Sequence, residues 1–143
     1  MPENVPSEYG DFPLQAFLGM TLTNDDAGTG VSIVDAGLDH MNPNGVVHGA
    51  VLFALVDTAM GKATMSVIDE PDAYCASIEV SMRFIRPAVA GPLTATASVL
   101  KCGRNVVHLE SRVTSEDNRL VATSAGSFAV LRPQEQHQSS AHE

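Results

Sequence analysis

Over most of its length the chain alternates apolar and polar residues, with the two-residue period of half-buried β-strands. The clearest case runs from Ile78 to Phe84, where apolar residues alternate with Ser, Glu and Arg. Clusters of Gly, Pro, Asn and Asp separate the alternating runs. The predicted strand segments are two short runs within 17–38, then 78–84, 93–101, 106–114 and 120–131. Because short turns join neighbouring runs, we predict an antiparallel sheet.

One segment, from His48 to Ile68, breaks this pattern and predicts a long helix. It contains no proline and is apolar on nearly every face, and its only charged residues are Asp57 and Lys62. A helix that is apolar all round is buried. The order of two strands, one buried helix and four strands predicts an α+β domain. One sheet face covers only part of such a helix, so we expect a second copy of the chain to cover the rest.

The two ends of the chain are polar and differ from the middle. Residues 1–16 carry three prolines and are expected to form an N-terminal arm, and residues 133–143 a flexible tail. The folded domain is therefore expected to span 17–132. The 143 residues are 44% hydrophobic, which is typical of a single globular domain.

Charge and composition narrow the classes of function. The net charge of −9 argues against nucleic-acid binding. No uncharged apolar run approaches about 18 residues, which argues against a membrane span. The first residues lack the pattern of a signal peptide, and two cysteines are too few for a disulfide framework. We therefore expect a cytoplasmic protein that binds neither nucleic acid nor membrane.

Asp57 is the residue that most needs a functional explanation. It lies in the middle of the apolar helix, and burying an ionised carboxylate without a partner is costly. Asp57 could be catalytic, or it could face an exposed groove or pair with Lys62. A separation of five residues suits that pair poorly, because facing residues on a helix are three or four apart. The sequence leaves the catalytic and the structural interpretation open.

The start of the helix is the second candidate. The turn Asn42-Pro43-Asn44-Gly45 leads into His48 and Gly49, and the first amides of a helix have no intrahelical acceptors. Those amides and the helix dipole favour negative charge, so the Gly49 N–H suits a developing oxyanion. Ordinary capping, with a glycine for close packing, explains the same residues. His48 suits a general base, a positioning donor or a structural histidine.

The sequence lacks the patterns of several other chemistries. No spacing of His or Cys residues is typical of a metal site. There is no Gly-x-Ser-x-Gly motif around a nucleophilic serine. There is also no glycine-rich loop for a nucleotide phosphate. We therefore predict neither a metal nor a cofactor.

The helix start and its acidic residue, together with the strand that follows, carry a family resemblance. From Phe17 to Leu131 the chain resembles the hotdog-fold acyl-CoA thioesterases, in particular the phenylacetate-pathway type (PaaI-like) related to the Arthrobacter-type 4-hydroxybenzoyl-CoA thioesterases. Many relatives have a second glycine where this chain has Ala50. The resemblance implies a curled antiparallel sheet around one long helix, paired into a homodimer or a dimer of dimers. The residues that carry it are Asn42, Gly45, His48-Gly49-Ala50, Leu55-Val56-Asp57, Ser77, Arg86-Pro87-Ala88 and Gly91-Pro92-Leu93.

The resemblance also implies roles for five residues in the hydrolysis of an acyl-CoA thioester. Asp57 matches the carboxylate that acts as general base or as nucleophile. The Gly49 amide matches the group that polarises the thioester carbonyl, and Asn42 with His48 helps to orient the reacting groups. Ser77 matches a hydroxyl that positions the attacking water, expected from the partner subunit.

The spacing of two of these residues bears on how the site is built. Gly49 and Asp57 are eight positions apart, which is about 12 Å along a helix. One amide and one carboxylate at that distance in the same chain cannot both contact the same substrate atom. In a dimer, however, Asp57 of one chain can face Gly49 of the other. The spacing therefore supports a site that two subunits share.

The CoA phosphates need cations, although the chain is acidic overall. We expect contacts from basic residues among Arg83, Arg86, Lys101 and Arg104, with Arg104 the best single candidate; solvated surface roles fit them equally well. The residues expected to line the acyl pocket, each of which a place in the core would explain equally well, are Phe53, Met60, Met65, Met82 and Phe84. The sequence does not indicate which short, medium-chain or aryl acyl group is preferred.

Two other functions fit the same fold. Hotdog hydratases and dehydratases use a His and a carboxylate in the spacing Asp-x-x-x-x-Asn-x-x-His, which is missing here. Hotdog regulators that bind acyl-CoA without catalysis carry a DNA-binding helix-turn-helix ahead of the domain, for which 16 residues leave no room. A ligand sensor that acts through protein contacts stays open as an alternative.

Overall fold

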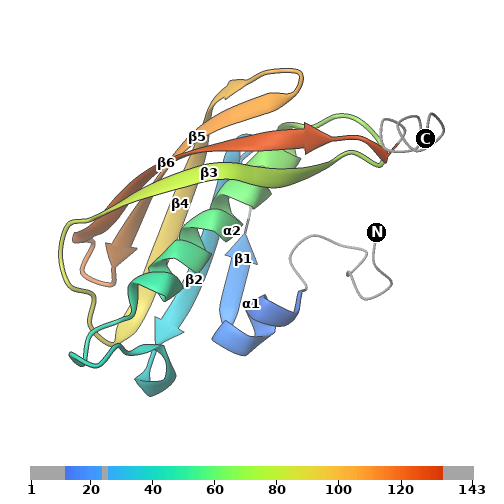
Figure 1. Cartoon of the computed structure of the whole chain (residues 1–143). Coiled ribbons are helices and arrows are strands. Elements are labelled where there is room, and N and C mark those ends of the chain that lie inside the picture. The colour runs from blue at the N-terminus through green and yellow to red at the C-terminus, as the bar shows by residue number, and fades with distance from the viewer. Residues whose placement is uncertain (1–11, 24–25, 134–143) are drawn as a thin grey trace.

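The protein is described from a computed structural model, which covers residues 12–23 and 26–133. Six antiparallel strands form one sheet in the order β1-β2-β4-β5-β6-β3, and a long helix, α2, lies against it (Figure 1). The strands are β1 (Met20–Thr23), β2 (Thr29–Ala36), β3 (Tyr74–Phe84), β4 (Gly91–Cys102), β5 (Val106–Ser115) and β6 (Leu120–Leu131). The helices are α1 (Pro13–Leu18), the 3₁₀ turn η1 (Leu38–His40) and α2 (Gly49–Val67).

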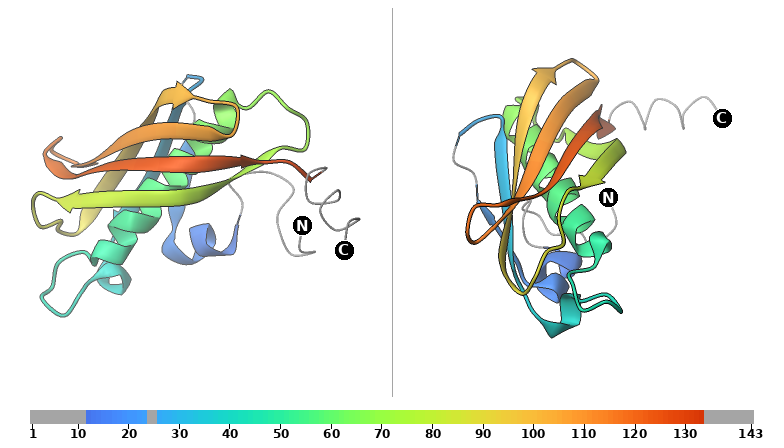
Figure 2. Two further views of the ribbon diagram at one scale, coloured as in Figure 1. Left: turned by 45° about the horizontal axis from the view of Figure 1, so that its top comes forward. Right: turned by 90° about the vertical axis from the view of Figure 1, so that its left-hand side faces the viewer.

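The sheet curls so that α2 lies along its inner face, as the two turned views show (Figure 2). Alternate residues of β4 and β5 point inward and pack against buried residues of the helix such as Leu55, Ala59 and Met60. At Gly30 of β2 a side chain would overlap the Ala59 carbonyl, so only glycine lets strand and helix approach this closely. The neighbouring Ser32 hydroxyl donates to the Leu55 carbonyl at 2.6 Å.

The predicted hotdog architecture, an α+β domain with a curled antiparallel sheet around one helix, is confirmed. The predicted helix is one residue longer at each end than α2. Strand β3 begins at Tyr74 and not at Ile78, because a bulge between Ser77 and Glu79 interrupts the alternation there. The short α1 crosses the predicted boundary between arm and domain. Residues 1–11 of the predicted arm and 134–143 of the predicted tail lie outside the described residues.

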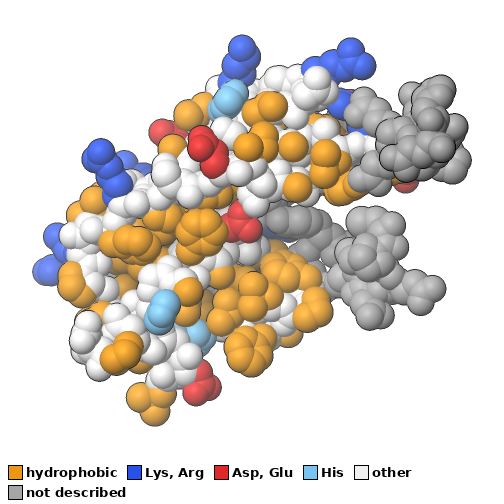
Figure 3. All heavy atoms as spheres, viewed as in Figure 1, with side chains coloured by type: hydrophobic (Ala, Val, Ile, Leu, Met, Phe, Trp, Pro, Cys, Tyr) orange, Lys and Arg blue, Asp and Glu red, His pale blue; other side chains and the backbone are white. Residues whose placement is uncertain are grey.

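Helix α2 is long and apolar enough, by length and composition alone, to cross a membrane. Its place against the sheet and its burial are those of a core helix. One stripe of α2 is less covered, and we call Ala50, Phe53, Ala54 and Asp57 the open stripe. Hydrophobic side chains gather on the face of the molecule where α2 lies (Figure 3). The sheet therefore covers only part of this helix.

Strand β3 is an edge of the sheet, since its one strand neighbour is β6. It is 11 residues long and carries the exposed side chains of Ile78 and Phe84. A long edge with exposed apolar residues offers unpaired backbone groups to another strand. The open stripe of α2 and the edge strand β3 are thus two neighbouring surfaces that no other described element covers.

Candidate active site

Asp57 lies on the open stripe of α2, and its carboxylate is only partly accessible. Its Oδ1 atom is buried and has no hydrogen-bond partner among the described residues. Among the described residues no ion pair joins Asp57 to Lys62. The alternative that Asp57 is a structural residue paired with Lys62 is therefore wrong. Burial raises the pKa of Asp57, and a hydrogen bond with the Ser77 side chain acts in the opposite direction. One oxygen of this buried carboxylate is therefore left without a partner among the described residues.

Ser77 reaches Asp57 from strand β3 of the same chain. It pairs with Phe128 of β6, whose side chain is buried on the helix side of the sheet, and the bulge follows at once. A bulge of this kind re-aims the side chains beside it. Ser77 and Asp57 therefore lie close together within one chain, and the expectation that Ser77 also serves the site of the partner subunit stays a prediction.

Cys75 joins Asp57 and Ser77, and the three residues form what we call the carboxylate cluster. The Cys75 thiol lies against the Gly61 carbonyl, with Sγ 3.8 Å from the oxygen. Burial and the Asp57 charge raise the pKa of Cys75 to about 11. The sequence interpretation missed Cys75, although its position two residues before Ser77 on a strand puts both on one face.

The two cysteines are therefore expected to differ in reactivity. At about pH 8 a thiol with a pKa near 11 is only on the order of 0.1% thiolate, and the thiolate is the reactive form. Cys102 is exposed, so it should react first with a disulfide dye and Cys75 roughly 100-fold more slowly. The measurement is a time course of dye release with the native protein. A Cys102→Ser variant should keep only the slow phase; a fast phase in that variant would contradict the assignment.

The loop before α2 is held by Asn42. The Asn42 Oδ1 accepts hydrogen bonds from the backbone N–H groups of Asn44 at 2.8 Å and Val46 at 3.3 Å. The Asn42 N–H donates to the Val46 carbonyl at 2.7 Å. Its side-chain nitrogen makes no hydrogen bond with the described residues. Asn42 therefore shapes the loop with its oxygen and keeps a free donor for another group.

His48 caps the start of α2. The ring Nδ1 of His48 accepts a hydrogen bond from the backbone N–H of Ala50 at 2.9 Å. The backbone N–H of His48 donates to the His40 carbonyl at 2.8 Å. Since Nδ1 is an acceptor, the neutral ring carries its proton on Nε2. Of the three roles considered for His48, the geometry supports the structural one and leaves Nε2 as a donor at an exposed position.

Gly49 is the first residue of α2, and its N–H has no acceptor within the described chain. It opens onto a pocket of about 330 Å³, which we call the amide pocket. The ring of Phe84 lies directly against Gly49: a Cβ there would be 3.3 Å from Cζ. The pocket is lined by Asn42, Val46, Val47, Gly49, Leu52, Phe84, Ile85, Arg86, Pro87 and Ala88.

The structure thus brings the predicted site residues into two groups. Asn42, Gly49 and Arg86 line the amide pocket, whereas Asp57 and Ser77 belong to the carboxylate cluster. The two groups are about 12 Å apart along the helix, since eight residues separate Gly49 from Asp57. Phe53 lies on the open stripe, 41% exposed, one turn before Asp57.

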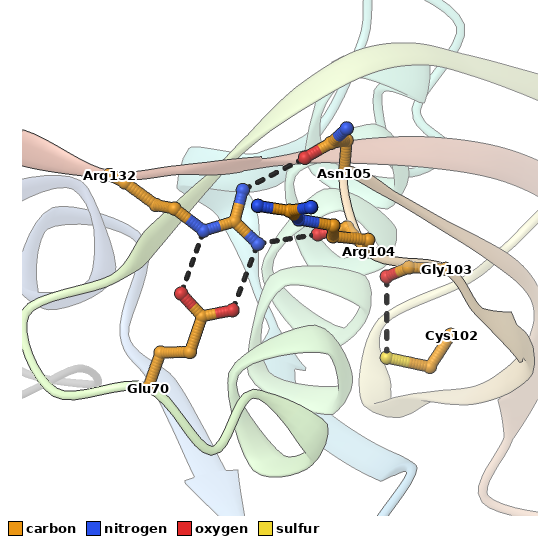
Figure 4. Close-up of polar contacts among 6 residues, drawn as sticks. All are labelled: Glu70, Cys102, Gly103, Arg104, Asn105 and Arg132. Atoms are coloured by element: carbon orange, nitrogen blue, oxygen red, sulfur yellow. Dashed lines mark hydrogen bonds and ion pairs between the residues drawn. The ribbon is translucent and has the colours of Figure 1, made fainter. Parts of the chain in front are cut away.

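Lys101 and Arg104 lie far from the amide pocket of the same chain. They belong to the end of β4 and the turn after it, beside the end of α2. Figure 4 shows the network there: the Arg132 guanidinium donates to Glu70 and to the Arg104 carbonyl. Arg86 lies at the opposite end of the helix. One chain therefore does not gather the predicted CoA-binding cations, and within the described part no His, Cys, Asp and Glu group could hold a metal.

Comparison with known proteins supports a common family. The family described as "Thioesterase superfamily" matches residues 44–122. A Halobacterium salinarum protein named "Putative esterase" is 34% identical over 140 residues, which cover 90% of this chain and 91% of that one. The 1,4-dihydroxy-2-naphthoyl-CoA hydrolase of Listeria monocytogenes is 26% identical over 119 residues, 83% of this chain and 96% of that one.

A solved structure shows the same architecture. The PaaI protein of the Escherichia coli phenylacetic acid degradation operon superposes with a TM-score of 0.76 at 26% identity, covering 82% of this chain and 83% of that one. Residues 44–122, which match the thioesterase superfamily, contain Gly49, Asp57 and Ser77, whose geometry was described above. The chain therefore belongs to the thioesterase superfamily and is a thioester hydrolase of hotdog fold.

Proposed function

We propose that this hydrolase cleaves acyl-CoA thioesters, with Asp57 as general base or nucleophile and the Gly49 amide as the oxyanion donor. The observation that carries the proposal is the buried Oδ1 of Asp57, which has no partner among the described residues and lies in a mostly apolar helix. Such a costly group is retained where chemistry uses it. The CoA part of the proposal is supported by the Listeria relative, which is named as a CoA hydrolase. The phenylacetate-pathway branch belongs to the proposal as well.

The reaction needs a polarised carbonyl and an activated water. As general base, Asp57 takes a proton from water while the water oxygen attacks the thioester carbon. The carbonyl oxygen becomes an oxyanion beside the Gly49 N–H and the positive end of the α2 dipole. The C–S bond then breaks, the thiol leaves with a proton, and the acid is released. As nucleophile, the Asp57 carboxylate attacks the thioester carbon, the C–S bond breaks with release of the CoA thiolate, and water hydrolyses the resulting anhydride in a second step.

The proposal includes a homodimer in which the two groups of residues meet. Within one chain the amide pocket and the carboxylate cluster are too far apart to hold one thioester. The open stripe of α2 and the edge of β3 are the surfaces that a second copy would cover. In that dimer Asp57 and Ser77 of one subunit would face Gly49 and Asn42 of the other.

The test is a panel of acyl-CoA thioesters of rising chain length and of aryl acyl-CoAs. Free thiol is followed with a thiol dye against an enzyme-only blank, because Cys102 is exposed. We expect CoA release, with weaker cleavage of matched oxygen esters. No release from any thioester would overturn the proposal. In that case tight acyl-CoA binding would indicate a sensor, and water addition to an enoyl-CoA would indicate a hydratase.

A further inference from the structure

We propose that His40 is a positioning residue that holds the start of α2, and with it the Gly49 amide, in place. The inference rests on the proposed function, since it concerns the oxyanion donor of that site. It starts from the ring of His40 at the end of η1, because both of its nitrogens bond to the backbone. The contacts that carry the inference all lie within one chain.

The His40 ring satisfies backbone groups at the ends of two short helices, which have no partner within their own helix. Its Nδ1 lies 2.9 Å from the backbone nitrogen of Gly37, the residue that precedes η1. Its Nε2 lies 2.9 Å from the carbonyl oxygen of Leu18, the last residue of α1. Since an N–H only donates and a carbonyl only accepts, Nδ1 accepts and Nε2 carries the proton. One ring in one tautomer thus ties η1 to α1, 22 positions earlier in the chain.

The backbone of His40 connects this anchor to the start of α2. The His40 carbonyl accepts the His48 N–H at 2.8 Å, and an antiparallel bridge one residue further in continues the pairing. Residues 40–48 therefore form a small hairpin, which we call the 40–48 hairpin. Gly49 follows it directly, so the direction of the Gly49 N–H depends on how this hairpin is held.

The 40–48 hairpin is held from two sides. On one side the Val47 N–H donates to the Ala88 carbonyl, at 2.8 Å, in the loop after β3. On the other side the His40 ring donates to Leu18 of α1. An oxyanion donor is effective because it is fixed before the charge develops, and a displacement of about 1 Å can cost about 100-fold in rate. Without the ring the hairpin keeps the first attachment and loses the second, so the Gly49 amide gains freedom to move.

The experiment compares His40→Ala, His40→Asn and His40→Gln in thioester hydrolysis, well below each melting temperature. His40→Ala should lower kcat by about 10- to 100-fold and leave KM within about 2-fold, because a misplaced amide weakens a contact made in the transition state. The oxygen of Asn can take the place of Nδ1, and the nitrogen of Gln that of Nε2. Each of these variants keeps one of the two hydrogen bonds, so each should recover part of the lost kcat.

Ser66→Ala is the matched control, because the Ser66 hydroxyl also bonds two backbone groups. It accepts the Gly28 N–H at 2.8 Å and donates to the Ala63 carbonyl at 2.6 Å. These bonds tie the residue before β2 to the last turn of α2, at the opposite end of the helix from Gly49. Ser66→Ala should lower the melting temperature and leave kcat unchanged. An equal loss of kcat in this control would reduce the effect of His40→Ala to general destabilisation and refute the positioning role.

Hydrogen exchange of backbone amides gives a second readout, which needs no substrate. In His40→Ala the amides of the 40–48 hairpin should exchange about 10-fold faster or more than in the wild type, and in Ser66→Ala they should not. A wild-type kcat in His40→Ala would overturn the inference, whatever its melting temperature, and so would unchanged exchange in the hairpin. Wild-type inactivity on every thioester would instead refute the proposed function, while the exchange rates would still test the anchor.

Discussion

Replacing Asp57 by Asn is expected to lower kcat/KM for thioester hydrolysis by about 10²- to 10⁴-fold, the range typical for loss of a general base. The amide keeps the shape of the carboxyl group but neither accepts a proton nor attacks the carbonyl. The substitution should also raise the thermal stability at neutral pH, because it removes a charge that burial disfavours. Loss of activity together with a higher melting temperature separates a functional role from a structural one.

The pH dependence of the activity and of the thermal stability follows from the direction in which the pKa of Asp57 is shifted. The pKa of Asp57 is raised in the folded protein above the ordinary aspartate value of 3.8, because burial disfavours the charged form. The folded state therefore binds more protons than the unfolded state between 3.8 and the raised pKa, and stability falls as pH rises through that window. The stability gain of Asp57→Asn should be full above the raised pKa, shrink as the pH falls through that window, and vanish only below 3.8. Hydrolysis by the wild type should show the reverse and fall as the carboxylate is protonated.

Melting curves and kcat/KM across pH check these expectations. Asp35→Asn is the matched control, because Asp35 is an exposed carboxylate on β2. It should change neither the activity nor the pH dependence. An Asp57→Asn protein that hydrolyses acyl-CoA at the wild-type rate would contradict the role proposed for Asp57.

A heterodimer of Asp57→Asn and Gly49→Val chains is expected to recover about half of the wild-type activity, although each variant alone is inactive. Valine at position 49 would press on the Phe84 ring and block the amide pocket. If two subunits share each site, one site of the heterodimer combines an intact Gly49 with an intact Asp57. The measurement is the specific activity of heterodimers isolated through two different affinity tags.

The reciprocal pairing provides the control for this experiment. A wild-type chain paired with a chain that carries both substitutions has no intact shared site, so this heterodimer should be inactive. A site built within one chain predicts the opposite result. The heterodimer of the wild-type chain with the doubly substituted chain would then keep half of the activity, and the heterodimer of the two single variants would have none. That result would overturn the shared site while leaving the chemistry of Asp57 in place.

The element types and two of the candidate residues could be predicted from local sequence. Strands and the long helix have different periods, and these appear in any window of ten residues. Asp57 was found because a charge in an apolar helix is costly wherever the helix packs. Gly49 was found because the first amides of any helix lack acceptors. These properties depend on near neighbours in the chain, so the sequence by itself determined them.

Tertiary structure decided which residues meet. The bulge after Ser77 and the register of β3 against β6 bring Ser77 to Asp57 within one chain and put Phe84 over Gly49. The same antiparallel order carries Arg104 to the opposite end of α2 from Arg86. Strand register arises from packing between segments distant in sequence, and a shift of one residue reverses every side chain. No local pattern encodes such contacts, which is why the folded sheet was needed to show them.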